Sequence, residues 1–238
     1  MKNLLLIPKA LAVALIASPL LLTSCDKTKT EDPTPQVTTN GTSTSNLSAE
    51  DKQKNAAFDK EISRIISQME QDMKKVQNSY TKDPDVDFAH LTIVHHDAGI
   101  AMAQTELTYG HHDEAKKLAE SSIRSQKSSK QRLTDFLASH GTPEPAFTEE
   151  FAAFRKEMDA AIADMIEHMR SSPNTLDVDY DFAEVFKRHH QGIVKMSSIE
   201  VEFGDDDPVT DEGKMIIRDQ GQEVIELSQF INKHGYPR

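Results

Sequence analysis

Two stretches of the sequence decide the fold: AHLTIVHHDAGIAMAQTEL at residues 89–107 and AEVFKRHHQGIVKMSSIEV at residues 183–201. Each contains two adjacent histidines, followed at the same spacing by a methionine and then by a glutamate. Shifting the chain by 94 residues carries His95-His96 onto His189-His190. A repeat of chemically specific residues at one fixed offset indicates an internal duplication.

The duplication extends well beyond the two histidine pairs. With the same offset Asp85 matches Asp179, and His140-Gly141 matches His234-Gly235, without a gap between them. We therefore divide the folded part of the chain into repeat one, residues 49–143, and repeat two, residues 144–238.

Each repeat is predicted to contain three helices. Apolar residues recur three and four positions apart, which is the period of an amphipathic helix, and no stretch alternates as a strand does. We expect Asp85 or Asp87 to cap the second helix and Gly110 to end it. The fold class is all-α, with helices predicted at about 50–79, 85–110, 113–139, 147–171, 180–203 and 208–233.

The N-terminus has the pattern of an export signal. Residues 1–24 contain two lysines and an apolar run that is too short for a membrane span, so they predict a signal peptide. The run ends in Leu-Thr-Ser before Cys25, the single cysteine of the chain, as in a bacterial lipobox. We expect Cys25 to be lipidated, although a plain secretory signal is the alternative. Residues 25–48 are rich in Thr, Ser, Pro and Asp and predict a flexible tether.

The charge of the chain restricts its partners. Loss of the signal peptide removes Lys2 and Lys9 and no acid, so the formal net charge changes from -12 to -14. Such an acidic protein is a poor partner for nucleic acid and for anionic lipid surfaces. The expected membrane contact is the lipid on Cys25, which places the protein in the bacterial cell envelope.

The four paired histidines are predicted to lie on, or at the edge of, buried helix faces. At about 100° per residue, His95 shares a stripe with Met102 and Glu106, and His189 shares the matching one. A buried imidazole needs a partner, which is either a hydrogen bond or a metal ion. Gln126 and Gln220 are the expected hydrogen-bond partners, or would orient the histidines around a metal. The methionines suit Cu(I), but they also fill a core well.

The repeated series of Phe, His-His, Met, Gly, Gln and Leu resembles the Domain of Unknown Function 305 family, over about residues 85–235. This resemblance implies exported proteins with a ferritin-like four-helix bundle, here with additional flanking helices, and an association of some relatives with copper. The association with copper favours a metal site formed by His95, His96, His189, His190, Met102 and Met196. Copper is the expected ion, and zinc is the alternative for imidazole ligands. The sequence departs from the family where a methionine usually precedes the histidine pair, since Thr92 and Phe186 stand there.

Catalysis has little support in the sequence. A ferritin-like di-iron enzyme needs inward Glu-x-x-His pairs, and the chain has none. We therefore expect a non-enzymatic protein, which is either a metal-binding protein of the envelope or a metal-free structural or interaction module. The other histidines have simpler explanations: His111-His112 is expected at the surface, and His140 and His234 next to the negative ends of helices.

Overall fold

The computed structural model describes residues 48–235, which fall within one compact unit of the chain. The signal peptide, Cys25 and nearly all of the predicted tether lie outside these residues. The described part is all-α, as predicted, and each predicted helix is present with its ends shifted by at most two residues. The helices are α1 (Ala49–Asn78), α2 (Pro84–Tyr109), α3 (Asp113–His140), α4 (Thr148–Arg170), α5 (Val178–Phe203) and α6 (Asp207–His234).

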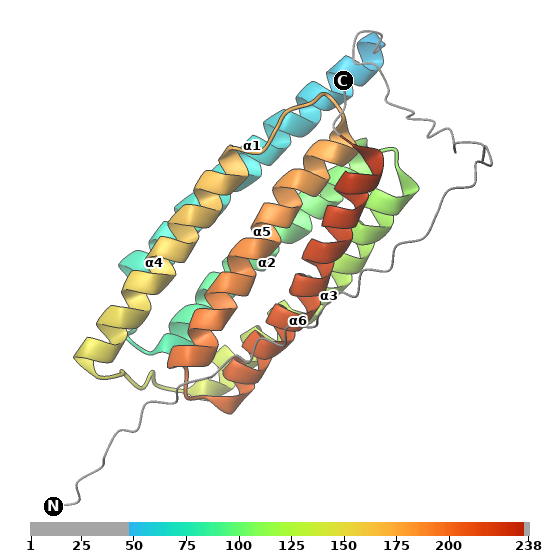
Figure 1. Ribbon diagram of the computed structural model, residues 1–238. Helices are drawn as coiled ribbons and strands as arrows, with labels where there is room; N and C mark the ends of the chain where they lie inside the picture. The colour runs from blue at the N-terminus through green and yellow to red at the C-terminus, as the bar shows by residue number, and fades with distance from the viewer. Residues whose placement is uncertain (1–47, 236–238) are drawn as a thin grey trace, which may run out of the picture. The chain divides into compact units, whose positions relative to one another are not determined.

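The six helices form three layers of two (Figure 1). The central layer consists of α2 and α5, which carry the histidine pairs and contact each other. On one side α3 packs on α2 and α6 packs on α5, and on the other side α1 packs on α2 and α4 on α5. The predicted four-helix bundle is therefore α2, α3, α5 and α6, and the flanking helices are α1 and α4.

The start of α2 differs from the prediction that Asp85 or Asp87 caps it. The N-cap is Asp83, whose carboxylate accepts a hydrogen bond from a backbone N–H of the first turn. Pro84 occupies the first helical position, where its missing N–H costs nothing, so the cap has to precede it. Asp87 instead turns back and accepts the backbone N–H of Thr81 at 2.8 Å, which fixes the preceding loop.

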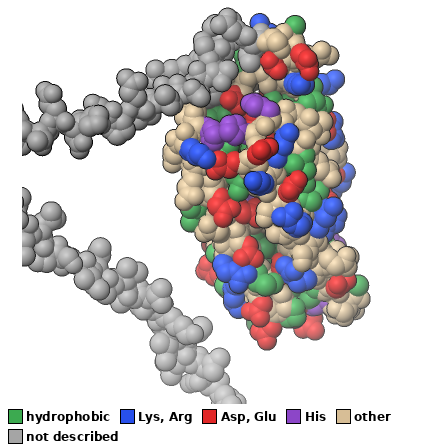
Figure 2. All heavy atoms as spheres, turned by 90° about the vertical axis from the view of Figure 1, so that its right-hand side faces the viewer, with side chains coloured by type: hydrophobic (Ala, Val, Ile, Leu, Met, Phe, Trp, Pro, Cys, Tyr) green, Lys and Arg blue, Asp and Glu red, His purple; other side chains and the backbone are tan. Residues whose placement is uncertain are grey.

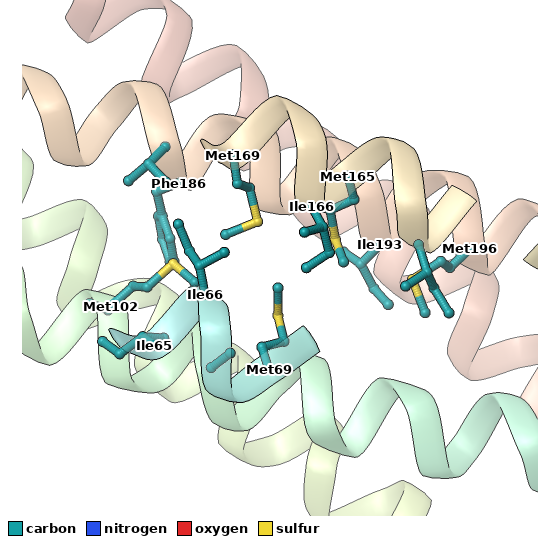
Figure 3. Close-up of a cluster of buried hydrophobic side chains, with 14 of the residues drawn as sticks. Ile65, Ile66, Met69, Met102, Met165, Ile166, Met169, Phe186, Ile193 and Met196 are labelled. Atoms are coloured by element: carbon teal, nitrogen blue, oxygen red, sulfur yellow. The ribbon is translucent and has the colours of Figure 1, made fainter. Parts of the chain in front are cut away.

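An apolar cluster rich in methionine and isoleucine lies between the central layer and the α1–α4 layer. Figure 3 shows Met102 of α2 and Met196 of α5 within this cluster, beside side chains of α1 and α4. Both methionines are completely buried. Their surroundings are those expected of methionine as a flexible core residue.

None of the helices in residues 48–235 combines the length and apolar character that crossing a membrane would require.

Candidate functional site: a polar seam between the repeats

A line of buried polar residues runs along the contact between α2 and α5, and we call it the polar seam. It consists of three pairs, each joining repeat one to repeat two, and all six side chains are at most 1% exposed. The two helices run antiparallel, so a residue before His95 meets one after His189. The pairs are Asp85 with Glu200, His95 with His189, and Glu106 with Asp179.

His95 and His189 form the centre of the polar seam. Their rings stack with centroids 3.6 Å apart and planes 26° from parallel. Nε2 of His95 donates to the carbonyl of His189 at 3.1 Å, and Nε2 of His189 donates to the carbonyl of His95 at 3.2 Å. Because a carbonyl only accepts, these bonds place the proton of each ring on Nε2. The opposite nitrogen, Nδ1, then has a free lone pair, and no hydrogen-bond partner reaches it in either ring.

Both central imidazoles are neutral. Burial lowers the pKa of His95 well below its ordinary value, and the neighbouring imidazole of His189 lowers it further. Burial, followed by the neighbouring His190, does the same to the pKa of His189. Removing a charged ring from water is unfavourable, so the unprotonated form persists in the folded protein.

His190 has a different environment from the central pair. Its Nδ1 lies 2.8 Å from the carbonyl of Phe186 and its Nε2 lies 2.7 Å from the carboxylate of Glu223. Both ring nitrogens lie within hydrogen-bonding distance of oxygen atoms, so His190 links the backbone of α5 to the carboxylate of Glu223 on α6. Burial acts to raise the pKa of Glu223, but the hydrogen bond and charge of His190 outweigh it and lower this pKa.

His96, the counterpart of His190, has no carboxylate partner. Its Nε2 lies 2.8 Å from the hydroxyl of Ser129, which stands where repeat two has Glu223, and its Nδ1 has no partner. Burial lowers the pKa of His96 to about 3, so this ring is neutral. The two repeats therefore share the same helical arrangement but differ in the partner of this histidine, which is a hydroxyl in repeat one and a carboxylate in repeat two.

The ends of the polar seam are two carboxyl–carboxylate pairs. Asp179 accepts the backbone N–H groups of His111 and His112 at 3.0 and 2.7 Å. Glu106 finds no donor among the surrounding groups, so its carboxyl group must itself supply the proton to Asp179. Burial, with Asp179 as the second cause, raises the pKa of Glu106 to about 9.

The same arrangement closes the other end. Asp85 accepts the backbone N–H groups of Asp205 and Asp206 at 3.1 and 3.2 Å. Burial and the adjacent Asp85 raise the pKa of Glu200 well above its ordinary value, so Glu200 holds the proton.

Glycines make room for both carboxyl pairs. A Cβ atom on Gly110 would overlap the carboxyl group of Glu106, and one on Gly204 would overlap that of Glu200. Neither glycine has a positive φ angle, so the backbone conformation does not require glycine there. The close approach of the glutamate side chain does. Gly110 does end α2, as predicted.

The predicted glutamines do not bind the histidines directly. Gln126 donates to the hydroxyl of Ser122 at 2.8 Å, and that hydroxyl lies 3.2 Å from Nε2 of His190. The side-chain oxygen of Gln220 has no hydrogen-bond partner. Backbone carbonyls, serines and Glu223 occupy the places that the sequence suggested for glutamine.

The histidines do not converge as metal ligands in this arrangement. Within residues 48–235 no three His, Cys, Asp or Glu side chains are grouped so as to hold a metal ion. The lone pairs of an imidazole lie in the plane of its ring, so the stacked rings of His95 and His189 cannot direct them at one ion. Met102 and Met196 lie in the apolar cluster of Figure 3. The feature that does suit a metal is the set of unpartnered Nδ1 atoms, on His95, His96 and His189.

Comparison with known proteins finds a family model that matches this chain in two places. The family model described as "Domain of unknown function (DUF305)" matches residues 27–137 and again residues 124–231. A crystal structure of a DUF305 fragment from Deinococcus radiodurans is similar at 20% identity with a TM-score of 0.47, covering 63% of this chain and 96% of that one. Among curated proteins none matches the chain.

Proposed function

We propose, from the premise that this chain belongs to the DUF305 family, that it is a lipid-anchored protein of the bacterial cell envelope whose bundle is a metal-free structural or interaction module. In this proposal the polar seam holds the two repeats together. The observation that carries it is the mutual bonding of His95 and His189, in which each Nε2 donates to the other's backbone carbonyl.

The complete burial of the polar seam supports a role without catalysis. Its side chains are at most 1% exposed, so a substrate has no path to them in this conformation. Every buried pair instead connects α2 to α5. Buried polar contacts of this kind contribute register between packed helices, because a shifted pairing would leave charges or donors without partners.

Binding of a transition metal by the core histidines is a second candidate, with copper before zinc. The observation in its favour is that His95, His96 and His189 are neutral and each has an unpartnered Nδ1. Neutral imidazole is the form that binds metals. A buried acceptor without a partner lowers the free energy of unfolding by about 1 to 3 kcal/mol. A metal ion bound to these nitrogens would remove that cost.

Replacing the four core histidines by glutamine separates the two candidates. We expect the variant to be less stable than the wild type, and we expect both proteins to give the same titration with Cu(I), Cu(II) and Zn(II), since the histidines serve the fold. The full chain would be purified in detergent without a histidine tag, and metal binding would be measured by titration, with helicity followed by circular dichroism. The single variant His96→Gln repeats the test with a smaller perturbation. A loss of metal affinity in either folded variant would favour the metal site instead.

The lipid anchor is tested independently of the bundle. We expect Cys25→Ala to abolish labelling by a fatty acid analogue in cells and to release the protein from the membrane fraction. Undiminished labelling of this variant would contradict the anchor while leaving the role of the polar seam untouched.

A further inference from the structure

A surface hollow lined by basic residues lies between α4 and α5 of repeat two, which are neighbouring helices (Figure 1). Three cationic residues of α5 line it, Lys187, Arg188 and Lys195, together with His168 of α4. We call it the basic hollow. Its volume is about 400 Å³, which is within the size range of small-molecule sites. None of these side chains belongs to the polar seam.

The charge of the basic hollow is opposite to that of the chain. The formal net charge of the protein is -12, and acidic and basic side chains are intermixed on the face formed by α3 and α6 (Figure 2). At the hollow, Glu184 is the shared partner of Lys187 at 3.0 Å and of Arg188 at 3.5 Å. Asp164 also lines the hollow, and Lys195 forms no ion pair with any residue of the range 48–235. Among the lining residues and their ion-pair partners, three permanent cations therefore stand beside two carboxylates.

Repeat one shows that the fold does not need these cations. With the offset of 94 residues, the three cations of α5 have apolar counterparts on α2. These counterparts are Ile93, Val94 and Ala101. They are partly buried and pack against the apolar core. Because both repeats form the same helices, a cation at these positions is not required for packing. The cations are specific to repeat two, and they are available to a partner of opposite charge.

Arg188 gives the basic hollow one cation that is held in place. Its Nη1 donates to the carbonyl of His168 at 3.1 Å and to the hydroxyl of Ser171 at 3.2 Å, both at the end of α4. Its Nε is buried and has no hydrogen-bond partner. A cation that is fixed before a ligand arrives loses little conformational freedom on binding, so Arg188 is preorganised for an anion.

The spacing of the lysines suits a compact anion. Lys187 and Lys195 are eight residues apart, which is about 12 Å along α5. Their flexible stems allow both ammonium groups to approach an anion that lies between them. Salt screens exposed charges beyond about 8 Å, so the acidic remainder of the chain does not cancel this local attraction. An extended anionic surface would meet that remainder, whereas a single small anion would not.

We propose that the basic hollow binds a phosphate group, either that of a small soluble ester or that of a lipid headgroup. A phosphate carries negative charge and several acceptor oxygens, which match the guanidinium of Arg188 and the ammonium groups of Lys187 and Lys195. Ala161 and Met165 also line the hollow and provide an apolar surface for the rest of the ligand. The site is independent of the polar seam and of the lipid on Cys25, so it goes beyond the function proposed above.

Lys195→Gln tests the site without endangering the fold, because Lys195 is exposed. The full chain in non-ionic detergent would be titrated with inorganic phosphate by calorimetry at constant ionic strength, and the wild type should bind saturably. The affinity should fall about threefold in Lys195→Gln, the effect of one partly exposed charge, and further in the double variant with Lys187→Gln. Phosphate should also raise the melting temperature of the wild type more than that of either variant.

Lys127→Gln is the matched control, because Lys127 is also an exposed helical lysine but lies on α3. Both substitutions change the net charge equally, so an effect of overall charge would be the same in both. The control variant should bind phosphate as the wild type does.

A second titration identifies the source of the phosphate group. In it, detergent micelles containing phosphatidylglycerol replace inorganic phosphate. Binding of inorganic phosphate alone assigns the site to a soluble ester, and binding of phosphatidylglycerol that depends on Lys195 assigns it to a lipid headgroup. The proposal is overturned if neither source binds, if Lys195→Gln binds as tightly as the wild type, or if Lys127→Gln weakens binding as much as Lys195→Gln does.

Discussion

Replacing Glu106 by glutamine should make the protein more stable at neutral and alkaline pH. In the folded protein Glu106 carries a proton and donates it to Asp179, and a glutamine amide can donate in the same place without a proton equilibrium. The folded pKa of Glu106, about 9, is raised above its ordinary value of 4.5. Its contribution to stability is therefore complete below about pH 4.5 and is lost as the pH rises through 9.

The size of the effect follows from the raised pKa. One pH unit between the two pKa values corresponds to about 1.4 kcal/mol, so the contribution of Glu106 falls by about 3 kcal/mol between pH 4.5 and pH 7. Glu106→Gln does not undergo this loss. We therefore compare the free energy of unfolding of the variant with that of the wild type at each pH. This difference should shift in favour of the variant by up to about 3 kcal/mol between pH 4.5 and pH 7.

Urea unfolding at pH 4.5, 7 and 9, followed by circular dichroism, measures this difference. All other titrating groups are present in both proteins and cancel in the comparison. Glu202→Gln is the matched control, because Glu202 is an exposed glutamate of α5 and should show no pH-dependent difference. A Glu106→Gln difference that is independent of pH, or that decreases as the pH rises, would refute the shared proton.

Three further perturbations test other parts of the bundle. Burial lowers the pKa of His96 to about 3, so its contribution to the free energy of unfolding is lost as the pH falls below 6.5, the ordinary pKa of histidine. Urea unfolding should show the wild type losing about 3 kcal/mol relative to His96→Gln between pH 6.5 and pH 4.5. In thermal denaturation Gly110→Ala should cost about 1 to 3 kcal/mol through overlap with the carboxyl group beside it, whereas Gly221→Ala, with open space around it, should be neutral or slightly stabilising. Glu223→Gln should lower the free energy of unfolding by about 1 to 3 kcal/mol at pH 7. The difference should shrink as the pH falls below 4.5, the ordinary pKa of a glutamate, and through the lowered pKa of Glu223 in the folded protein. Equal unfolding curves in any of these comparisons would contradict the corresponding contact.

Local patterns were sufficient to predict the helices and the burial of the histidines. The three-four spacing of apolar residues depends only on neighbours along the chain, so the helices of both repeats could be placed to within a few residues. The rotation of about 100° per residue placed His95 and Glu106 on one buried stripe, and both are completely buried. The duplication followed directly from comparing the sequence with itself.

The partners of these residues could not be read from one helix. Asp85 lies ten residues before His95, and Glu200 lies eleven residues after His189, so an antiparallel crossing at the histidines brings the two acids together. This signal was present in the sequence, but it becomes visible only once the crossing point is known. The cap at Asp83 was not predicted, because Asp85 and Asp87 in the first turn of α2 are residues of the same type and suit an N-cap equally well.

The contacts between α2 and α5 bear on how the duplicated chain evolved. Each pair of the polar seam takes one residue from each repeat, so a single repeat would need a second copy of itself to complete them. Two identical subunits related by a twofold axis must carry the same residue at both related positions. Joining the copies in one polypeptide removes that constraint, and assembly no longer depends on protein concentration. Equivalent positions of the two repeats can then hold different residues, as Ser129 and Glu223 do, and His112 and Asp206. Each repeat can therefore acquire its own chemistry.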